Sequence, residues 1–375
     1  MNKVLLGDVA VEHKETCKGS KDGYPIVGLE HLIPEEITLT AWDEGSENTF
    51  SKMFRKGNVL FGRRRAYLKK AAVAPFDGIC SGDITVIEAK PDRILPELLP
   101  FIIQNDDLFD FAVGKSAGSL SPRVKWEHLK NYEFELPDME KQKELAELLW
   151  AMDNTKKSYQ KLIVATDELV KSQFMEQFGS YLGDETRCAT VEQVCTVFAD
   201  GDWIESKDQA DDGIRLIQTG NVGNGVYLDK GERARYIDEE TFVRLNCTEV
   251  LPNDILISRL PDPVGRACII PDGLGKSITA VDCSIVRLKS HVLPEFFVAY
   301  TMTTLYAAQI GSSVTGSTRK RISRKNLGQV VIPTPDIDQQ EQFAAFVRQS
   351  DKSKFAVQSC SNLNLWSSSV CQTTM

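Results

Sequence analysis

Basic side chains gather in a few acid-free stretches of the sequence. Between Lys52 and Lys70 eight residues are basic and none is acidic. Between Glu295 and Asp336 the only charged residues are Arg319, Lys320, Arg321, Arg324 and Lys325. The acid-free stretch 111–126 adds Lys115, Arg123 and Lys125. Cations that neutralise phosphates release counterions, so these stretches indicate a nucleic-acid surface despite the net charge of −9. Each stretch taken alone could also be an ordinary solvated face.

The sequence is internally duplicated, which favours the first interpretation. The segment Gly57–Arg63 (GNVLFGR) returns as Asn253–Arg259 (NDILISR), and Leu95–Leu99 returns as Leu293–Phe297. Gly118-Ser119 with Arg123-Val124 returns as Gly316-Ser317 with Arg321-Ile322, and Pro137-Asp138 with Gln142 returns as Pro335-Asp336 with Gln340. A period of about 198 residues is far longer than a solenoid unit of roughly 20–50 residues. The chain is therefore predicted to contain two copies of one unit. Two similar units on one chain suit a ligand with two similar halves.

Candidate contacts to DNA lie in matching places of both copies. Arginine reads guanine through two hydrogen bonds, and Ser, Thr, Asn and Gln contact bases or phosphates. The candidates in the first copy are Arg63, Arg64, Arg65, Lys69, Ser116, Ser119 and Arg123. The candidates in the second copy are Gln218, Asn221, Arg259, Arg266, Lys276, Thr315, Ser317, Thr318, Arg319 and Arg321. The alternative for each is a structural role; Arg259, for example, could pair with Asp254 or Asp262.

Motifs of catalysis and cofactor binding are absent from the sequence. It has no G-x-G-x-x-G after a strand, no Asn/Asp-Pro-Pro-aromatic sequence and no Walker loop, so we expect no cofactor. Its four histidines lack metal spacing. Asp83 with Glu88-Ala89-Lys90 has the spacing of a metal-dependent nuclease strand, but the second copy carries Arg287 where a magnesium ligand would be required. We therefore predict no catalytic residue and no metal.

Each copy divides into a mixed head and a helical tail. Residues 79–89 and 278–288 have the β-branched alternation of strands, as do 58–61 and 254–258. After Leu95 and Leu293 the apolar spacing becomes helical. We therefore predict α+β heads over 1–137 and 179–335.

The two tails are predicted to be long helices, 138–178 and 336–375, the second with a frayed end. Asp138 and Asp336 are placed to cap them. The first carries a stripe of Leu145, Leu149, Met152, Tyr159, Ile163, Thr166, Val170 and Gln173, and the second carries Phe343, Val347, Ser350, Lys354 and Val357. About 40 residues make about 60 Å of helix, the length of a spacer or a coiled-coil arm. Pairing of the two tails would bury both stripes; packing of each tail on its own head is the alternative.

This order of motifs resembles the specificity subunit of type I restriction–modification systems. Each copy opens with a short amphipathic turn (Leu6–Ala10 and Val191–Val194), continues with G-D/N-I/V-L and an arginine, and enters a long helix through proline-aspartate. The resemblance covers about residues 1–370. It implies two target recognition domains, each reading half of a bipartite double-stranded DNA site, and an antiparallel rod of the two helices that fixes the gap. It also implies two methyltransferase subunits and a motor-nuclease subunit as partners, with no catalysis in the specificity subunit itself.

Composition is consistent with a cytoplasmic protein without a membrane span. Hydrophobic residues make up 42% of the chain and charged residues 26%, as in soluble globular proteins. Nine cysteines without a C-x-x-C pair favour reduced thiols. The uncharged stretch 296–318 is long enough to cross a bilayer but is rich in Thr, Ser and Gln, so we predict a buried helix and a polar loop. The alternative to a DNA-specificity subunit is a coiled-coil interaction scaffold with two ligand-binding heads.

Overall fold

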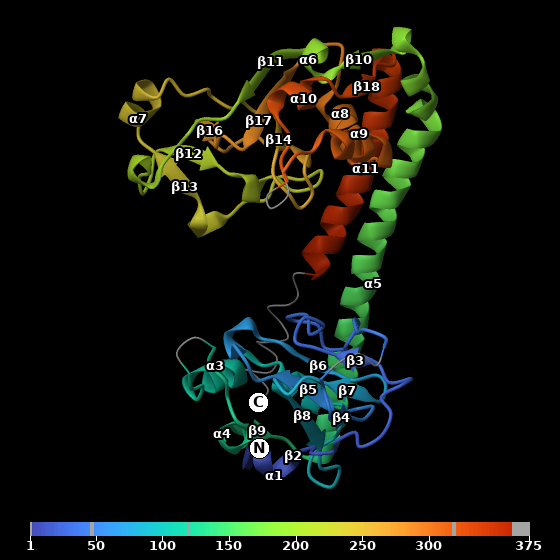
Figure 1. Ribbon diagram of the computed structural model, residues 1–375, viewed down its shortest axis with the longest axis vertical. Helices are drawn as coiled ribbons and strands as arrows, with labels where there is room; N and C mark the ends of the chain where they lie inside the picture. Colours follow the sequence, from blue (N-terminus) through green and yellow to red (C-terminus); the bar gives the residue numbers. More distant parts are fainter. Residues whose placement is uncertain (1, 46–48, 119–120, 317–319, 362–375) are drawn as a thin grey trace. The chain divides into compact units, whose positions relative to one another are not determined.

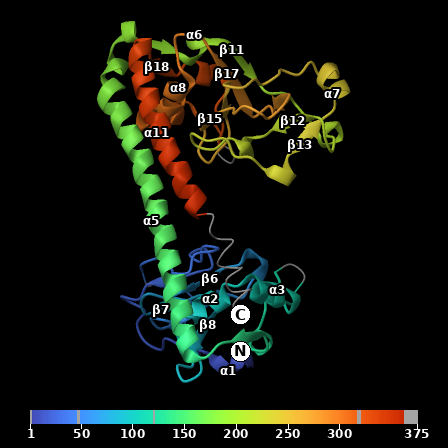
Figure 2. The ribbon, with the colours of Figure 1, turned by 180° about the vertical axis from the view of Figure 1, so that it is seen from behind.

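The computed structural model describes residues 2–45, 49–118, 121–316 and 320–361, with side chains as far as residue 352. It falls into two compact units, residues 1–160 and 161–357 (Figures 1 and 2). Each unit contains one head and a part of the long helix α5 (Met139–Phe178). The boundary between the two units, at residues 160 and 161, lies inside this helix.

The first head is built from two small sheets that share a core. One sheet has the antiparallel order β2 (Ala10–Glu12), β8 (Ile84–Ala89), β5 (Val59–Gly62), β6 (Ala71–Val73). The other has the order β3 (Ile26–Val27), β7 (Gly78–Cys80), β4 (Lys52–Phe54). A third pair joins β1 (Asn2–Leu5) to β9 (Glu133–Leu136). The helices of this head are α1 (Leu6–Val9), α2 (Leu99–Ile103), α3 (Asp106–Gly114) and α4 (Trp126–Leu129).

The second head repeats this arrangement. Its larger sheet has the order β11 (Cys195–Asp200), β17 (Cys283–Leu288), β14 (Ile255–Ser258), β15 (Ala267–Ile269). The other sheets are β13 (Arg235–Ile237), β12 (Ile214–Ile217), β16 (Ser277–Thr279), and β10 (Cys188–Thr190) with β18 (Val331–Pro333). Its helices are α6 (Val191–Val194), α7 (Glu239–Arg244), α8 (Pro294–Thr301), α9 (Thr304–Ser313) and α10 (Arg324–Gly328). The duplication in the sequence is thus confirmed as a duplication of the fold.

The predicted strand 79–89 is wrong in one respect, because it forms two strands in different sheets. β7 and β8 are separated by a turn in which Ile84 N–H donates to the Ser81 carbonyl, 3.0 Å away. The second head has the same break between β16 and β17, where Cys283 N–H donates to the Ala280 carbonyl at 2.9 Å. In the first head the turn carries Ser81, Gly82 and Asp83, which are turn-forming residues. The prediction of one continuous strand from the β-branched residues on either side overlooked this signal. The strands predicted at 58–61 and 254–258 are confirmed as β5 and β14.

The long helix predicted after Asp138 is confirmed as α5, which is 40 residues or about 60 Å long. Asp138 Oδ1 accepts the Lys141 N–H at 2.9 Å, so the predicted cap is present. Leu145 and Leu149 pack into the first head. Between them and Val170 most side chains of the helix are half-buried or exposed.

The last turns of α5 pack against α11 (Ile337–Ser361) and the second head. Phe174 and Phe178 lie 5.4 and 5.6 Å, between ring centroids, from Phe343 of α11. The hydroxyl of Tyr181, just after the end of α5, donates to Gln339 Oε1 at 3.2 Å, so the chain reaches earlier residues of α11 as it leaves α5. The two helices are antiparallel here, and both figures show them side by side (Figures 1 and 2). This confirms the pairing of the tails within the second unit, whereas the side chains of Lys354 and Val357 lie outside the described residues.

A buried glutamine joins each long helix to its head. Gln142 Oε1 accepts the Leu95 N–H at 2.8 Å, and its Nε2 donates to the Pro137 carbonyl at 2.9 Å. Gln340 makes the same two bonds, to Leu293 N–H at 2.9 Å and the Pro335 carbonyl at 2.8 Å. The helix start is thereby tied to the loop before α2 or α8 in the same way in both copies.

Within the described residues, none of the helices combines the length and apolar character of a membrane span. The uncharged stretch 296–318, which is long enough for a membrane span, forms most of α8 and all of α9. The side chains buried in the second head include Phe296, Phe297, Tyr300 and Tyr306.

Candidate nucleic-acid interface

Three segments of the first head meet beyond the end of β5. Arg63 N–H donates to the Asp83 carbonyl, and the Arg63 carbonyl accepts the Val124 N–H, both at 3.0 Å. The loop that follows α3 closes on itself through two 3.0 Å backbone bonds between Ala117 and Arg123. We call Arg63, Arg64, Asp83 and Arg123 the first arginine clip. Their backbone positions are fixed although they are far apart in the sequence.

The side chains of the first arginine clip converge on Asp83. Arg123 donates from Nε to Asp83 Oδ1 at 2.7 Å and from Nη2 to Oδ2 at 3.2 Å. Arg64 Nη1 lies 3.5 Å from the same Oδ2, and its Nε donates to Ser121 Oγ at 2.5 Å. The hydrogen bonds from Arg123 lower the pKa of Asp83, and the charges of Arg64 and Arg63 add to this. Three guanidinium groups surround one carboxylate, so the clip keeps a positive charge that suits an anionic ligand.

The second head contains the equivalent cluster, the second arginine clip of Arg259, Asp282 and Arg321. Arg259 N–H donates to the Asp282 carbonyl at 2.9 Å, and its carbonyl accepts the Ile322 N–H at 3.2 Å. Thr315 and Arg321 are joined by two 2.9 Å backbone bonds, as Ala117 and Arg123 are. Arg321 Nη2 lies 3.1 Å from Asp282 Oδ1. The same carboxylate–arginine pair therefore stands at the same place in both heads.

The glycines of these loops adopt backbone angles that other residues rarely adopt. Gly118 has φ of +118° and Gly316 has φ of +99°. A side chain at either position would strain the turn that brings Arg123 or Arg321 back towards its aspartate.

The Arg63 and Arg259 side chains occupy the inner end of each clip. Arg259 is only 4% exposed, donates from Nη2 to the Val281 carbonyl and lies 3.4 Å from Asp200 Oδ1. Burial lowers its pKa. The Nε atoms of both arginines are buried and have no hydrogen-bond acceptor in the part of the chain that the structure describes. A DNA contact by Arg259 would require rearrangement, and the pairing with Asp254 or Asp262 considered from sequence is replaced by one with Asp200.

Arg266 and Asn221, both predicted to contact DNA, hold loops of the second head together. Arg266 donates to five carbonyl oxygens at 2.6 to 3.1 Å, those of Thr219, Val222, Leu260, Pro261 and Pro263. Asn221 Oδ1 accepts the Gln218 N–H at 3.0 Å, and its Nδ2 donates to the Leu228 carbonyl at 2.9 Å. All three guanidinium nitrogens of Arg266 are used, which corrects its assignment from base contact to loop support.

Two predicted lysine contacts are paired within their own head. Lys69 Nζ lies 2.5 Å from Asp106 Oδ1. Lys276 Nζ lies 2.8 Å from a Glu239 carboxylate oxygen and 3.8 Å from the centroid of the Phe242 ring. Both ammonium groups remain partly exposed, so a phosphate can replace the carboxylate as their partner.

The other candidates are placed as follows. Arg65 is exposed, with φ of +53°, and its N–H donates to the Pro122 carbonyl at 2.9 Å. Ser116 Oγ donates to the Ala112 carbonyl at 2.8 Å, and Thr315 Oγ1 to the Arg321 carbonyl at 3.4 Å. Four candidates lie outside the described residues: Ser119, Ser317, Thr318 and Arg319.

A basic pocket near Gln218 was not predicted from the sequence. It has a volume of about 40 Å³ and is lined by four cations and Gln218, the cations being Arg215, Lys230, Arg233 and Arg235. Acidic residues interrupt this part of the sequence, so no acid-free stretch marked it.

Comparison with known proteins decides the family. The model of the type I restriction modification DNA specificity domain matches residues 3–164 and 186–362, one match for each copy of the repeat. The chain belongs to this specificity family. It is 20% identical over 366 residues to the putative type I restriction enzyme MjaX specificity subunit of Methanocaldococcus jannaschii, a match covering 90% of this chain and 83% of that protein. It is 25% identical over 183 residues to the EcoDI specificity subunit of Escherichia coli, covering 48% of this chain and 37% of that protein.

Solved structures of specificity subunits share the fold. The type I restriction–modification S subunit from M. genitalium has a TM-score of 0.53 at 11% identity, with coverage of 99% of this chain and 94% of that one. A chain from a study of the assembly and conformational transition of the type I R-M system has a TM-score of 0.55 at 19% identity, with coverage of 99% and 96%. At these identities the likeness establishes the fold alone.

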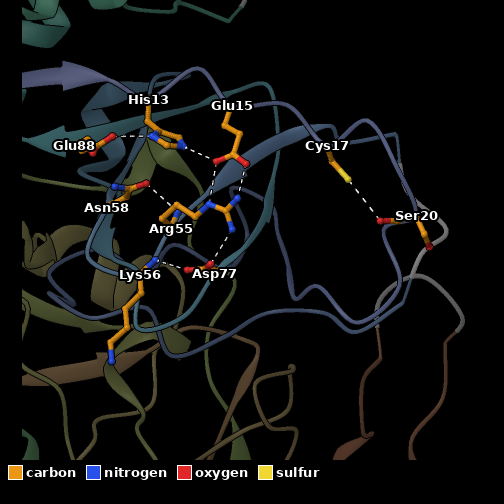
Figure 3. A network of polar contacts seen from close by, with 9 residues as sticks. All are labelled: His13, Glu15, Cys17, Ser20, Arg55, Lys56, Asn58, Asp77 and Glu88. Atoms are coloured by element: carbon orange, nitrogen blue, oxygen red, sulfur yellow. Dashed lines mark hydrogen bonds and ion pairs between the residues drawn. The ribbon is translucent and has the colours of Figure 1, made fainter.

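The nuclease-like spacing in this member of the specificity family is taken up by contacts within the head. Asp83 belongs to the first arginine clip, and Lys90 Nζ donates to the Gly7 carbonyl at 2.7 Å. Glu88 Oε2 bonds His13 Nδ1 at 2.7 Å, in a network that continues through Glu15 to Arg55 (Figure 3). In the described residues, no three His, Cys, Asp or Glu side chains are grouped so that they could hold a metal ion.

Proposed function

We propose that this chain is the DNA-reading subunit of a type I restriction–modification complex and that each head reads one half of a bipartite double-stranded site. The observation that carries the proposal is the arginine clip, which recurs in both heads. Each clip places exposed guanidinium groups on a loop that is fixed by backbone bonds. Two equivalent heads on one chain suit two half-sites separated by a gap.

The long helices are proposed to set that gap and to recruit two methyltransferase subunits, with motor-nuclease subunits added for restriction. The length of α5, about 60 Å, supports a spacer role. Its apolar side chains Leu148, Leu162, Val164 and Leu169 are 49–61% exposed, which supports a surface for partner subunits.

The chain is proposed to contribute recognition and no catalysis. With S-adenosylmethionine, magnesium and ATP, the isolated chain is expected neither to methylate nor to cut DNA. Turnover that disappeared in Asp83→Ala would refute this assignment.

The proposal is tested by assembling the chain with its methyltransferase subunits and mapping the methylated sites. We expect a bipartite sequence with an unspecified gap. Binding should weaken steeply as salt rises, with a log–log slope proportional to the number of phosphate contacts. Methylation without sequence preference, or binding that salt does not change, would favour the scaffold alternative.

A further inference from the structure

We propose that Arg123 and Arg321 each read a guanine in the major groove and that Asp83 and Asp282 are the positioning residues that orient them. This inference rests on the proposed function. It names the residues that read a base and the base that they read, which the proposed function does not specify. It predicts one guanine in each half-site, at equivalent places relative to the two heads.

The first argument is the set of donors that the Arg123–Asp83 pair leaves free; in the second head Arg321 approaches Asp282 through Nη2, at 3.1 Å. A guanidinium group has five N–H bonds arranged in one plane. Asp83 occupies the edge formed by Nε and Nη2 of Arg123, at 2.7 and 3.2 Å. The outer edge, formed by Nη1 and the second N–H of Nη2, has no acceptor in the described part of the head. Two parallel N–H bonds on this edge match the two acceptors of guanine, O6 and N7.

The second argument separates a base contact from a phosphate contact. The Arg123–Asp83 pair is close to neutral by itself, and the carboxylate would repel a phosphate brought to the same arginine. The fork by itself fits a phosphate as well as a base edge. The aspartate behind it reduces the gain from an anionic phosphate, but it does not oppose the neutral, two-acceptor edge of guanine. Arg64, beside the pair, carries the surplus charge that draws the DNA backbone to this surface.

The third argument is elimination among the other candidate arginines. Arg64 uses its Nε on Ser121, and its Nη1, which belongs to its outer edge, lies 3.5 Å from Asp83. Arg259 is 4% exposed, and all three nitrogens of Arg266 donate to carbonyls. Arg65 is exposed, but within the described residues no carboxylate orients its guanidinium group. The Arg123 and Arg321 side chains are 42% and 44% exposed. Arg123 and Arg321 therefore combine exposed guanidinium donors with an aspartate that fixes their orientation.

The fourth argument is retention in both copies. The residue after Arg63 in the first clip is Arg64, whereas the residue after Arg259 in the second is Leu260. Neighbouring positions have therefore changed, while the aspartate, the arginine and the bridge that joins the loop to itself remain. Retention of one pair in two diverged heads fits a contact that both half-sites need.

The test uses the complete methyltransferase complex and maps its methylated sites for Arg123→Lys and Arg321→Lys. Each variant keeps the positive charge and loses the fork. We expect the preference for guanine at one position of one half-site to fall about tenfold or more, while the other half-site keeps its sequence. The two variants should act on opposite half-sites, so either one tests the proposal if the other fails to assemble.

Asp83→Asn and Asp282→Asn test the positioning role separately. The asparagine keeps the shape and removes the charge, so the arginine is freed to contact phosphate. Guanine preference should fall at the position that the lysine variant identified, and affinity for unrelated DNA should stay equal or rise. A merely structural role would lower both together. Arg93→Lys, an exposed arginine of the first head that pairs with its neighbour Asp92, is the matched control and should change neither.

The outcomes separate this inference from the proposed function. A wild-type complex that methylates a bipartite site but keeps full guanine preference in both lysine variants would overturn the inference and leave the function standing. A half-site without guanine, or equal relaxation at every position, would do the same. A wild-type complex without sequence preference would overturn the proposed function itself.

Discussion

The buried glutamines at the starts of the long helices give a prediction whose size can be worked out from the structure. Gln340 is completely buried and makes three hydrogen bonds, to Leu293 N–H and to the carbonyls of His291 and Pro335, at 2.8 to 2.9 Å. Gln142 is 2% exposed and makes two. Leucine has a similar volume but no donor or acceptor. At about 1 kcal/mol net for each bond, Gln340→Leu should cost about 3 kcal/mol and Gln142→Leu about 2 kcal/mol of unfolding free energy.

Urea unfolding, followed by circular dichroism, measures these costs. With a slope of about 2 kcal/mol per molar urea, the midpoint of the second unit should fall by about 1.5 M in Gln340→Leu. Peptide-level hydrogen exchange should locate the loss at the start of α11 and at residues 289–297. Because Gln142 and Gln340 lie in different units, the double variant should show both losses, each in its own unit and of unchanged size.

Gln339→Leu is the matched control for this experiment. Gln339 is exposed and its side chain makes one bond of 3.2 Å, with the Tyr181 hydroxyl. It should cost less than about 1 kcal/mol. If Gln340→Leu were no more destabilising than this control, the reasoning that the glutamine fastens the helix to its head would be refuted.

Three further predictions follow from the described geometry. Inserting seven residues after Ile163 and seven after Ser361 adds about 10 Å to each helix. Methylation mapping should therefore find a gap wider by about one to three base pairs, with both half-site sequences unchanged. An active complex with the original gap would refute the spacer role. Replacing arginines 63–65 with alanine removes the cations around the Asp83–Arg123 pair, so it should relax one half-site about tenfold or more and leave the other intact. Equal loss in both would contradict one head per half-site. Burial raises the pKa of Cys80 and Cys268 to about 12, so few of these thiols are ionised at pH 8, and mass spectrometry should find them alkylated by iodoacetamide only after unfolding.

The long helix and the duplication could be predicted because their signals are local or repeated. α5 has a capping aspartate, an apolar stripe and no Gly or Pro within its 40 residues, and each of these acts within a few turns. The stripe missed Phe174 and Phe178, which pack on α11 and α8 at the end of the helix. Their partners are far away in the sequence, and nothing local marks them.

The roles of the arginines could not be predicted, because they depend on which carboxylate or carbonyl each one reaches. Asp83 and Arg123 are 40 residues apart in the sequence. Arg259 pairs with Asp200, and Asp254, one of the partners considered for it, pairs with Arg287 at 2.7 Å. Arg266 looked like a DNA contact by residue type, but the surrounding loop turns five carbonyls towards it. The residue type determines which hydrogen bonds an arginine can make, and long-range packing determines which of them form.

The two heads also show how one fold can change its charges without changing its backbone. Asn58 Oδ1 accepts the Arg55 N–H at 2.8 Å in the turn before β5 (Figure 3), and its counterpart Asp254 accepts the Leu251 N–H at 2.8 Å before β14. The turn therefore needs an acceptor and tolerates a charge only if the charge is paired. In the second head Arg287 supplies that pairing, at the position where the first head has Glu88. Compensated exchanges of this kind alter the surface around each clip while the aspartate–arginine pair persists, so differences between the two half-sites should be sought in the surrounding loops.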